Sequence, residues 1–508
     1  MSAFDNVYVF GIQQPALGTS HSSADAELEK PMRIRSGTAL HVRPLAAALA
    51  SLIGAQSFAA IESPDSATSR LVVVTADSPN VQGAFASRDA QLAIASNVLT
   101  VKNCQDDGTD SLRALISAAS DGDTIQFDTA QMQCSLITLS SAEIPIIRNN
   151  LTIEGPGTGE TITISGDGQH RVFNHVGTGL LAIGSLRIED GYAHDDGGCI
   201  RSDGSVSLSF VEVVGCTAVG DTANAHGGGI FAQRDITLRR STISENRAGT
   251  AMTAGYGGGV FGSHVTGGHE NVLIKYSSIT DNYASINGGG ALTGGTAYVL
   301  ASTIDHNSSR SAAALWLGGN TEIVNSTVSS NVANDNGAVA VLSRFGSLAI
   351  EGSTITLNHE DAMQAAGAVA FTGPSLGDEL MFQSSIIANN TSGTNNAAAD
   401  VFLVPGSQGT VVGAANLVGS SNVWPPGVFT ATSDAKLGPL LFNGGFTRTH
   451  VLLPDSPARG AGNNYAGQLQ DQRGEGYPRI TGAGPSATVD VGAIQFDSIY
   501  FGGFEFKN

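Results

Sequence analysis

The chain has 508 residues and a formal net charge of -20 at pH 7, and it contains 64 glycines but only 14% charged residues. Nucleic acid is excluded as a partner, because its phosphates would be repelled and no lysine or arginine cluster offsets the acidic charge. Abundant glycine with 6% aromatic residues favours a turn-rich β protein over a helical one, and 41% hydrophobic residues suffice for a core.

Residues 1–60 are predicted to be an N-terminal extension followed by a signal peptide. Three arginines precede an apolar run from Leu45 to Ile53, and small residues follow that run. The start codon is either Met1 or Met32. The alternative is an amphipathic helix retained in the mature protein. The apolar run is too short for a permanent span, and no later stretch is long enough, so no transmembrane segment is expected beyond the signal peptide.

Residues 61–135 are predicted to form a leading segment and an N-terminal cap. Asp110 or Ser111 can cap a helix in which Leu112, Leu115, Ile116 and Ala119 share one face. Such a helix would cover the first coil of a solenoid, whose core is otherwise open at its end. Cys104 and Cys134 flank this helix and the strand after it, so we expect a disulfide between them.

Residues 136–430 contain a repeat with the pattern Ser, Ser or Thr, Ile or Val, two variable residues and Asn. Six copies end at Asn246, Asn282, Asn307, Asn331, Asn358 and Asn389, and subtracting successive positions gives intervals of 24 to 36 residues. A period in the twenties with insertions is typical of one coil of a parallel β-helix. The predicted fold is therefore all-β, a right-handed parallel β-helix of the pectate-lyase-like solenoid kind with a short N-terminal capping helix.

Alternation within each coil predicts which side chains point inward. Apolar residues stand seven and five places before the repeat isoleucine, as Ile236 and Leu238 do before Ile243. The parity then changes, which indicates a bend between two strands. The asparagine follows at the next bend, where it tolerates a left-handed backbone and its amide can bond the asparagine of the next coil. We expect a ladder of stacked asparagines.

Glycine triplets mark another corner of the coil. The third glycine of a triplet precedes the repeat asparagine by 17 residues, as from Gly229 to Asn246, and Cys199 precedes Cys216 by the same number. The cysteines thus replace the glycine and the asparagine at the two ends of one coil, which a closed coil brings together. We expect a disulfide between them. Metal binding by the four cysteines is the weaker interpretation, because no zinc-type spacing is present.

The sequence pattern changes after residue 430. Residues 431–497 contain prolines and turn residues between short apolar runs and are predicted to form a C-terminal closing module, either as irregular coils along the solenoid or as a separate unit. Residues 498–508 are a tail.

Three segments carry a family resemblance. The segment CQDDGTDSLRALISAASDGDTIQFD resembles the N-terminal segment of CSLREA-type β-helix proteins, and the GGG-I and S-T-I-x-x-N copies resemble repeats of polymorphic outer membrane proteins. The tail from Leu437 to Phe496 resembles the choice-of-anchor Q domain in its GPL, NGG, LLP-x-SPA and D-Q-R-G patterns. The resemblance implies a β-helix at the surface of, or secreted by, a Gram-negative-type bacterium, and assigns no chemistry.

Stacking the repeats in register gives one set of candidate catalytic residues. Glu245, Asp281 and His306 stand two residues after the repeat isoleucine in successive coils, and Arg239 and Lys275 stand four residues before it. Carboxylates beside a base could bind calcium or perform acid–base chemistry on a polysaccharide. The alternative is that these residues are an ordinary row of solvent-exposed side chains near a turn, and this interpretation is favoured over a catalytic one.

Two functions remain open at the level of the sequence. The favoured one is an exported or cell-surface β-helix protein with a non-catalytic adhesion, binding or structural role, whose partners are surface glycans or components of a host or cell envelope. The alternative is a carbohydrate-active enzyme, a polysaccharide lyase or glycoside hydrolase, acting on the side of the solenoid. No cofactor is predicted, and no calcium-binding repeat supports calcium.

Overall fold

The computed structural model describes residues 97–496 apart from 158, 222–223, 263–270, 335–339, 362–366, 466 and 483–486. Contacts divide the chain into two units, Met1–Leu71 and Val72–Asn508, and every described residue belongs to the second. The predicted signal peptide therefore lies outside the described residues. No helix within the described part is long and apolar enough to cross a membrane.

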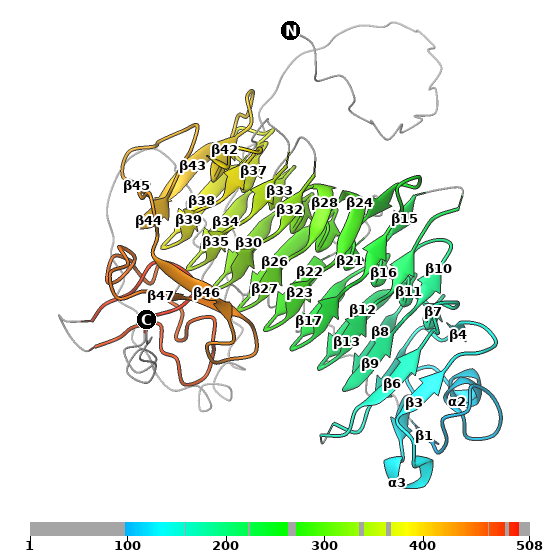
Figure 1. Ribbon diagram of the computed structural model, residues 1–508. Helices are drawn as coiled ribbons and strands as arrows, with labels where there is room; N and C mark the ends of the chain where they lie inside the picture. Colours follow the sequence, from blue (N-terminus) through cyan, green and yellow to red (C-terminus); the bar gives the residue numbers. More distant parts are fainter. Residues whose placement is uncertain are drawn as a thin grey trace, which may run out of the picture. The chain divides into compact units, whose positions relative to one another are not determined.

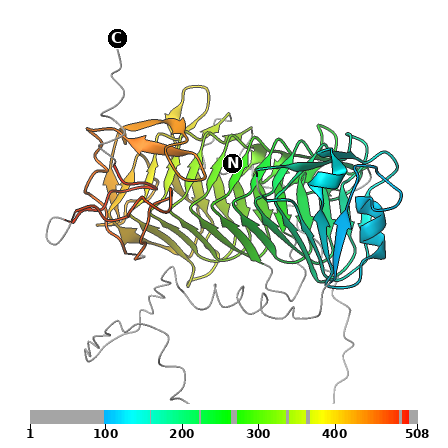
Figure 2. The same ribbon diagram turned by 90° about the horizontal axis from the view of Figure 1, so that it is seen from below.

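The described residues form a parallel β-helix in which each coil contributes a short strand to successive sheets (Figures 1 and 2). Sheet A contains the following strands in spatial order: β1 (Val98–Val101), β2 (Thr124–Phe127), β5 (Leu151–Glu154), β8 (Leu180–Gly184), β12 (Ser205–Ser209), β17 (Ile236–Arg239), β22 (Asn271–Lys275), β26 (Thr296–Leu300), β30 (Thr321–Val324), β34 (Leu348–Glu351), β38 (Glu379–Gln383) and β43 (Thr410–Ala414).

Sheet B follows sheet A around a corner in each coil. Its strands, again in spatial order, are these: β3 (Leu136–Thr138), β6 (Ile162–Ser165), β9 (Leu186–Glu189), β13 (Glu212–Val214), β18 (Thr242–Ser244), β23 (Ser278–Thr280), β27 (Thr303–Asp305), β31 (Thr327–Ser329), β35 (Thr354–Thr356), β39 (Ile386–Ala388), β44 (Asn416–Val418) and β45 (Phe429–Ala431).

Sheet C precedes sheet A in each coil. It contains these strands: β4 (Ile144–Ile146), β7 (Phe173–His175), β11 (Ile200–Ser202), β16 (Ile230–Ala232), β21 (Val260–Gly262), β25 (Ala291–Thr293), β29 (Leu315–Leu317), β33 (Val341–Ser343), β37 (Val369–Phe371) and β42 (Val401–Leu403).

Sheet D closes the coil between sheets B and C. Its strands are mostly two residues long and are these: β10 (Tyr192–Ala193), β14 (Thr217–Ala218), β15 (Ala225–His226), β19 (Arg247–Ala248), β20 (Gly255–Tyr256), β24 (Tyr283–Asn287), β28 (Ser308–Ser311), β32 (Val332–Ala333), β36 (His359–Glu360), β40 (Thr391–Ser392) and β41 (Ala397–Ala398).

One apolar core runs through the coils and is filled as the alternation predicts. In the coil of β16, β17 and β18, the side chains of Ile230, Ile236, Leu238 and Ile243 are all fully buried. Like residues stack on like, since Ile236 pairs with Val272 and Ile243 with Ile279 in the next coil. Each coil therefore needs only its neighbours to bury its apolar side chains.

The predicted helix lies at the N-terminal end of the solenoid. Helix α2 (Leu112–Ala118) begins at Ser111, whose hydroxyl accepts a hydrogen bond from the backbone of Ala114. Leu112 and Ile116 are buried, and the helix packs against β1, β2 and β4. A short second helix, α3 (Thr129–Met132), follows β2. The parallel sheets thus begin at Val98, inside the stretch that the sequence assigns to the leading segment and cap.

The predicted asparagine ladder exists, with one correction in its last step. Each asparagine after Asn246 accepts two bonds on its Oδ1, from the backbone N–H and the side-chain Nδ2 of the asparagine one coil earlier, at 2.8–3.1 Å. The sixth member is Asn390, not Asn389, because Ile355 pairs with Ile387 and the last repeat is shifted by one residue. The ladder ends on Asp400, which accepts from Asn390.

The left-handed residue of this bend is also corrected. The sequence predicts that the asparagine takes the left-handed backbone, whereas the residue before it does, as Glu245, Asp281 and Leu357 each have φ of 58°. The asparagine side chain can point inward to the ladder because its predecessor makes the turn. Asn389, with φ of 64°, holds this preceding position.

A second ladder, of serines, follows the corner between sheets A and B. The backbone N–H of Ser241 donates to Oγ of Ser277, and the same bond recurs from Ser277 to Ser302 and from Ser302 to Ser326. Each serine hydroxyl donates to a carbonyl two residues before it. The invariant first residue of the repeat thus satisfies backbone groups that the corner removes from the sheets.

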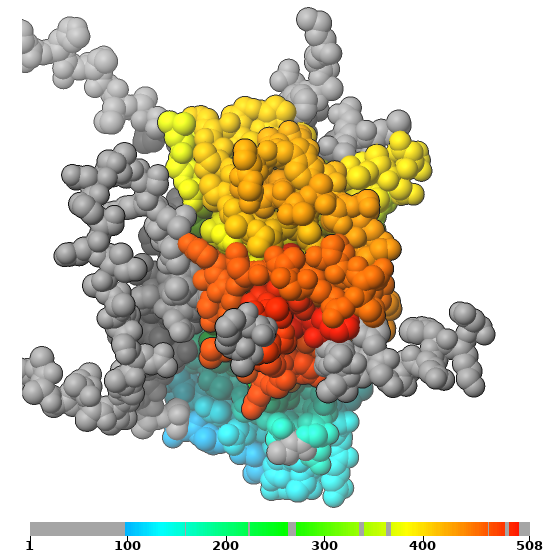
Figure 3. Space-filling model, turned by 90° about the vertical axis from the view of Figure 1, so that its left-hand side faces the viewer, coloured from blue at the N-terminus to red at the C-terminus, as the bar shows by residue number. Residues whose placement is uncertain are grey.

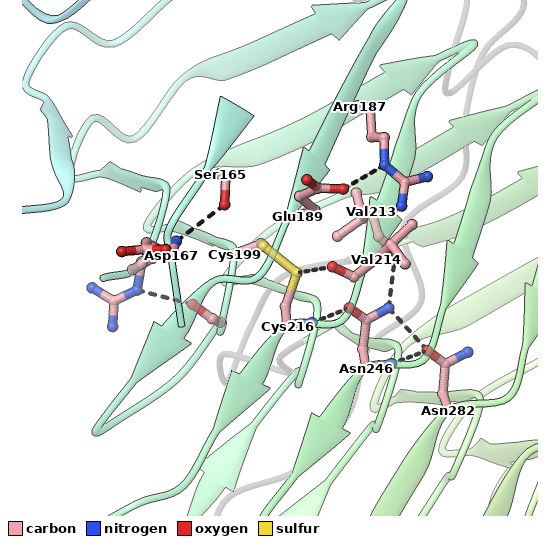
Figure 4. The surroundings of a disulfide bond; sticks show 12 residues. Ser165, Asp167, Arg187, Glu189, Cys199, Val213, Val214, Cys216, Asn246 and Asn282 are labelled. Carbon is pink, nitrogen blue, oxygen red and sulfur yellow. Dashed lines mark hydrogen bonds and ion pairs between the residues drawn. A yellow bond between two sulfur atoms is a disulfide. The ribbon is translucent and has the colours of Figure 1, made fainter. Parts of the chain in front are cut away.

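Both predicted disulfides, Cys104–Cys134 and Cys199–Cys216, are present, and no free cysteine occurs in the described residues. Figure 4 shows that Cys216 lies directly before the asparagine ladder, where its backbone N–H donates to Oδ1 of Asn246 at 3.0 Å. Two disulfides are typical of an extracellular or otherwise oxidising compartment.

Removing Cys199–Cys216 by a double change to alanine is expected to lower the free energy of unfolding by about 3 kcal/mol, because the bond closes a short loop in the unfolded chain. Removing Cys104–Cys134, which closes a longer loop, should cost about 0.5 kcal/mol more. Urea unfolding of each double variant measures both values. Unchanged urea midpoints in both variants would contradict this account.

The described residues of the C-terminal segment, 432–496, lie against the outer face of sheet B from β23 to β39, and Figure 3 shows this segment in orange and red on the side of the solenoid. It contains the antiparallel pair β46 (Leu437–Leu441) and β47 (Thr449–Leu452), which lies beside the sheet B strands in Figure 1. Gln472 accepts from Thr327 at 2.6 Å and donates to Thr303 at 2.9 Å, and Ala493 donates to Thr354 at 3.0 Å. The outward threonines of the repeat therefore bind this segment.

Candidate functional site

The predicted acidic column occupies a single bend of the solenoid. Glu245, Asp281 and His306 directly follow β18, β23 and β27, and backbone bonds from Glu245 to Thr280 and from Asp281 to Asp305 place them one coil apart. All three side chains are exposed. The three side chains therefore form an outward-facing row, at the residue of each bend that has the left-handed backbone conformation.

Arg239 and Lys275 lie elsewhere, at the ends of β17 and β22 in sheet A, where they pair across coils. The three-residue strand of sheet B separates them from the acidic file. The Lys275 ammonium lies 5.4 Å from the ring centre of Tyr298, and burial lowers the Lys275 pKa. No contact between the two sets occurs among the described residues, so they do not form one groove.

His306, one member of this file, belongs to an ion-pair network with Asp305 and Arg448 that the sequence did not predict. His306 Nδ1 lies 2.6 Å from Oδ2 of Asp305, and the guanidinium of Arg448 lies 2.5 Å from the same oxygen. The hydrogen bond with Asp305 raises the His306 pKa. The Asp305 side chain is 0% exposed beneath the C-terminal segment. This network joins that segment to sheet B, and no substrate can reach its carboxylate.

Two carboxylates with strongly shifted pKa values lie on the outer face of sheet A. Glu322 is on β30 and Glu351 ends β34, diagonally across neighbouring strands, at a Cα separation of about 8 Å from strand geometry. Burial raises the pKa of each to about 7, and the charge of Glu322 adds to the shift of Glu351. Neither has an ion-pair partner in the described part of the chain. Groups with such shifts mark functional sites more often than average.

The free energy of unfolding is expected to fall by up to about 3 kcal/mol as the pH rises from about 4.5 to above 7, owing to Glu351. Its folded pKa lies above its unfolded value, so its stabilising contribution is complete below the unfolded pKa and is lost as the carboxyl ionises. Urea unfolding across this pH range measures the slope. Glu351→Gln should reduce the slope and leave the part that Glu322 contributes, whereas Glu379→Gln, at the start of the next strand, should leave it unchanged. An unchanged slope in Glu351→Gln would refute the assignment.

The outer face of sheet C carries an unbroken file of apolar side chains. Its members are the middle residues of consecutive strands and pair in register from one coil to the next: Phe231, Phe261, Leu292, Trp316, Leu342, Ala370 and Phe402. We call this set the aromatic strip. Six steps of about 4.8 Å give it a length of about 29 Å.

Four rings gather at one end of the aromatic strip. Phe231 and Phe261 stack with ring centres 5.7 Å apart, and His226 lies 4.5 Å from Phe261 and 5.6 Å from Tyr256. Phe261, Trp316, Leu342 and Phe402 are partly exposed. Phe231, Leu292 and Ala370 are only 4%, 7% and 1% exposed, so the accessible apolar surface is interrupted. Partly exposed apolar side chains at the other four positions of one file still indicate a contact surface.

The sequence carries a signal for part of the aromatic strip. Phe231, Phe261 and Leu292 each follow the inward residue after a glycine triplet, so alternation alone places them outward.

Within the described residues, no group of three or more histidine, cysteine, aspartate or glutamate side chains is placed to hold a metal ion.

No protein family model matches the chain, and no curated protein matches it. Among solved structures, the crystal structure of pectate lyase Pel9A is similar with a TM-score of 0.44 and 12% identity, over 79% of this chain and 98% of that chain.

Proposed function

We propose that the protein is an exported, non-catalytic binding solenoid that holds an extended neutral glycan along the aromatic strip. The single observation that carries the proposal is the register of the strip, in which seven apolar side chains follow one another on consecutive coils and four of them are partly exposed. Aromatic rings offer flat apolar faces to the C–H faces of sugar rings. A length of about 29 Å matches a polymer rather than a single sugar.

Charge favours a neutral polymer. The chain carries a formal charge of -20, which would repel a uronic acid polymer, and the strip itself contains no cation. Arg201, which lies next to Phe231 in the register, is held by Asp203 at 2.8 Å and by Asn174 at 3.2 Å. The Arg201 guanidinium is therefore already paired within the protein.

The two tryptophans of the chain provide a direct test. In Trp424→Ala, Trp316 is the only tryptophan, so a polysaccharide bound to the strip should change its emission. Affinity electrophoresis against neutral polysaccharides should show binding by wild type and Trp424→Ala, and at least about tenfold weaker binding by Trp316→Ala and Phe261→Ala. If no neutral polysaccharide binds, or if Trp316→Ala binds as wild type does, the proposal is wrong.

The export route is part of the same proposal. The predicted signal peptide in residues 1–60 supports secretion or a cell-surface location in a Gram-negative-type bacterium, and the two disulfides suit an oxidising compartment. The resemblance to CSLREA-type, polymorphic outer membrane and choice-of-anchor Q proteins stays a prediction. Fractionation of cells expressing the full chain should recover it outside the cytoplasm.

A glycoside hydrolase is the second candidate, and one observation favours it. Glu322 and Glu351 share a face, and pKa values of about 7 suit general acid–base work. The measurement is release of reducing ends from the polysaccharides used above. Release that is lost in Glu351→Gln but kept in Glu379→Gln would select this candidate over the non-catalytic one.

A further inference from the structure

Three cations gather at the corner between sheets A and B, on two neighbouring coils. Arg239 and Lys275 end β17 and β22 and lie directly opposite one another in the strand register, and Arg240 follows Arg239 at the corner. None of the three has a carboxylate partner within the described residues, whereas Arg187, on sheet B, is held at 2.5 Å by each of two glutamates. We call Arg239, Arg240 and Lys275 the basic cluster.

The basic cluster destabilises the protein when nothing is bound to it. Like charges directly opposite one another on paired strands are unfavourable. The charge of Arg239 acts on Lys275, since burial and then this charge lower the Lys275 pKa. The chain has 45 acidic and 25 basic residues, yet no described carboxylate pairs with these cations. An anion bound to the cluster would offset the repulsion between the two cations.

Aromatic rings surround the guanidinium of Arg240. It lies 4.3 Å from the ring centre of Phe446, 5.4 Å from that of Phe210 and 5.9 Å from that of Tyr276. Phe210 and Tyr276 come from the coils on either side, and Phe446 comes from the loop between β46 and β47. Arg240 is exposed, and Phe210 and Phe446 are 54% and 53% exposed. Cation–π contacts thus position the guanidinium, while its N–H donors have no acceptor among the described residues.

The backbone at this corner does not favour such large side chains. Phe210, Arg240 and Tyr276 have φ of 57°, 48° and 52°, in the left-handed region that bulky residues rarely adopt. In later coils the same corner position is held by Asn325 and Gly352, which tolerate that conformation. Unfavourable backbone conformations that a protein retains are typical of functional sites. Two rings and a guanidinium on three consecutive coils therefore indicate a role for these side chains.

Charge and shape decide the kind of ligand. Cations with unpaired N–H donors favour an oxyanion, and exposed ring faces suit the C–H faces of a sugar. A peptide strand has no place to pair, because the backbone N–H groups of Phe210, Arg240 and Tyr276 all donate to the next coil. A phospholipid surface is usually recognised by a cluster of about four to eight cations, more than this cluster contains.

We propose that this corner binds an acidic glycan, whose sulfate or carboxylate groups pair with the basic cluster while a sugar ring lies against Phe210 and Phe446. The three cations offset the negative charge of the chain locally. The site is at a different place on the solenoid from the aromatic strip, goes beyond the neutral polymer proposed there and does not rest on it.

Three polymers with one backbone test the proposal: dextran, carboxymethyl dextran and dextran sulfate, each titrated into the full chain by isothermal titration calorimetry. At least one acidic polymer should bind the wild type, and which one binds shows whether the group is a carboxylate or a sulfate ester. Arg240→Asn and Arg239→Gln should each raise its Kd at least about tenfold, because each removes charge-assisted hydrogen bonds. Arg240→Asn should stay folded, since Asn325 holds the same corner position, as circular dichroism can verify.

Arg234→Gln is the matched control, because Arg234 is exposed before β17 in the same coil and its replacement removes the same charge. Its Kd should equal that of the wild type. Trp316→Ala should also keep binding to the acidic polymer, which separates this site from the strip.

The proposal is overturned if neither acidic polymer binds, or if Arg240→Asn and Arg239→Gln bind as tightly as the wild type. It is also overturned if Arg234→Gln weakens binding as much as they do, since only the overall charge would then matter. Binding to phosphatidylglycerol vesicles but to neither acidic polymer would overturn it in favour of a lipid surface.

Discussion

Replacing Asn331 with alanine is expected to lower the free energy of unfolding by about 3 to 5 kcal/mol. Its amide is fully buried and donates to the carbonyl of Ile304 and to Asn358, while its oxygen accepts twice from Asn307. Alanine leaves these buried partners unpaired, and each unpaired group costs about 1 to 3 kcal/mol. Urea unfolding measures the loss.

Asn395→Ala is the control for this change, because Asn395 is exposed in the turn before β41. Its free energy of unfolding should stay within about 0.5 kcal/mol of the wild type. A stronger control uses adjacent asparagines. Asn390→Ala should cost as much as Asn331→Ala, whereas Asn389→Gly should cost far less, since glycine suits the left-handed backbone there. Equal losses in these two variants would contradict the corrected register.

The repeat made the solenoid predictable because each residue contacts residues of the neighbouring coil at equivalent positions of the repeat. Residues that touch are one coil apart, so recurrence of Ser, Ile and Asn in the chain already describes the serine file, the core and the asparagine ladder. The spacing shared by Cys199–Cys216 and Gly229–Asn246 predicted a disulfide for the same reason. Asn389 was wrongly assigned to the ladder because two serines, Ser384 and Ser385, allow two alignments of the last repeat. Only the strand pairing distinguishes between them.

The candidate site was less predictable, because its parts do not repeat. Arg448 contacts Asp305, and Asn463 contacts Ser384, across 79 or more residues of chain, and no sequence period connects these positions. Glu322 and Glu351 stand outside the repeat, and their raised pKa values come from burial that a sequence does not display. The residues of the acidic column occupy a bend and lie apart from Arg239 and Lys275, which end strands of sheet A.

Arg448→Met is expected to weaken the attachment of the C-terminal segment by about 3 kcal/mol, because it removes the guanidinium from the fully buried Asp305 carboxylate and leaves His306 as its remaining ion-pair partner. Limited proteolysis should cut the C-terminal segment faster in this variant than in the wild type, since local opening exposes it. The double variant with Asp305→Ser should recover most of the protection, because Ser329 holds the same position in the next coil without a charge. Cleavage of Arg448→Met at the wild-type rate would show that the ion pair does not hold the segment on sheet B.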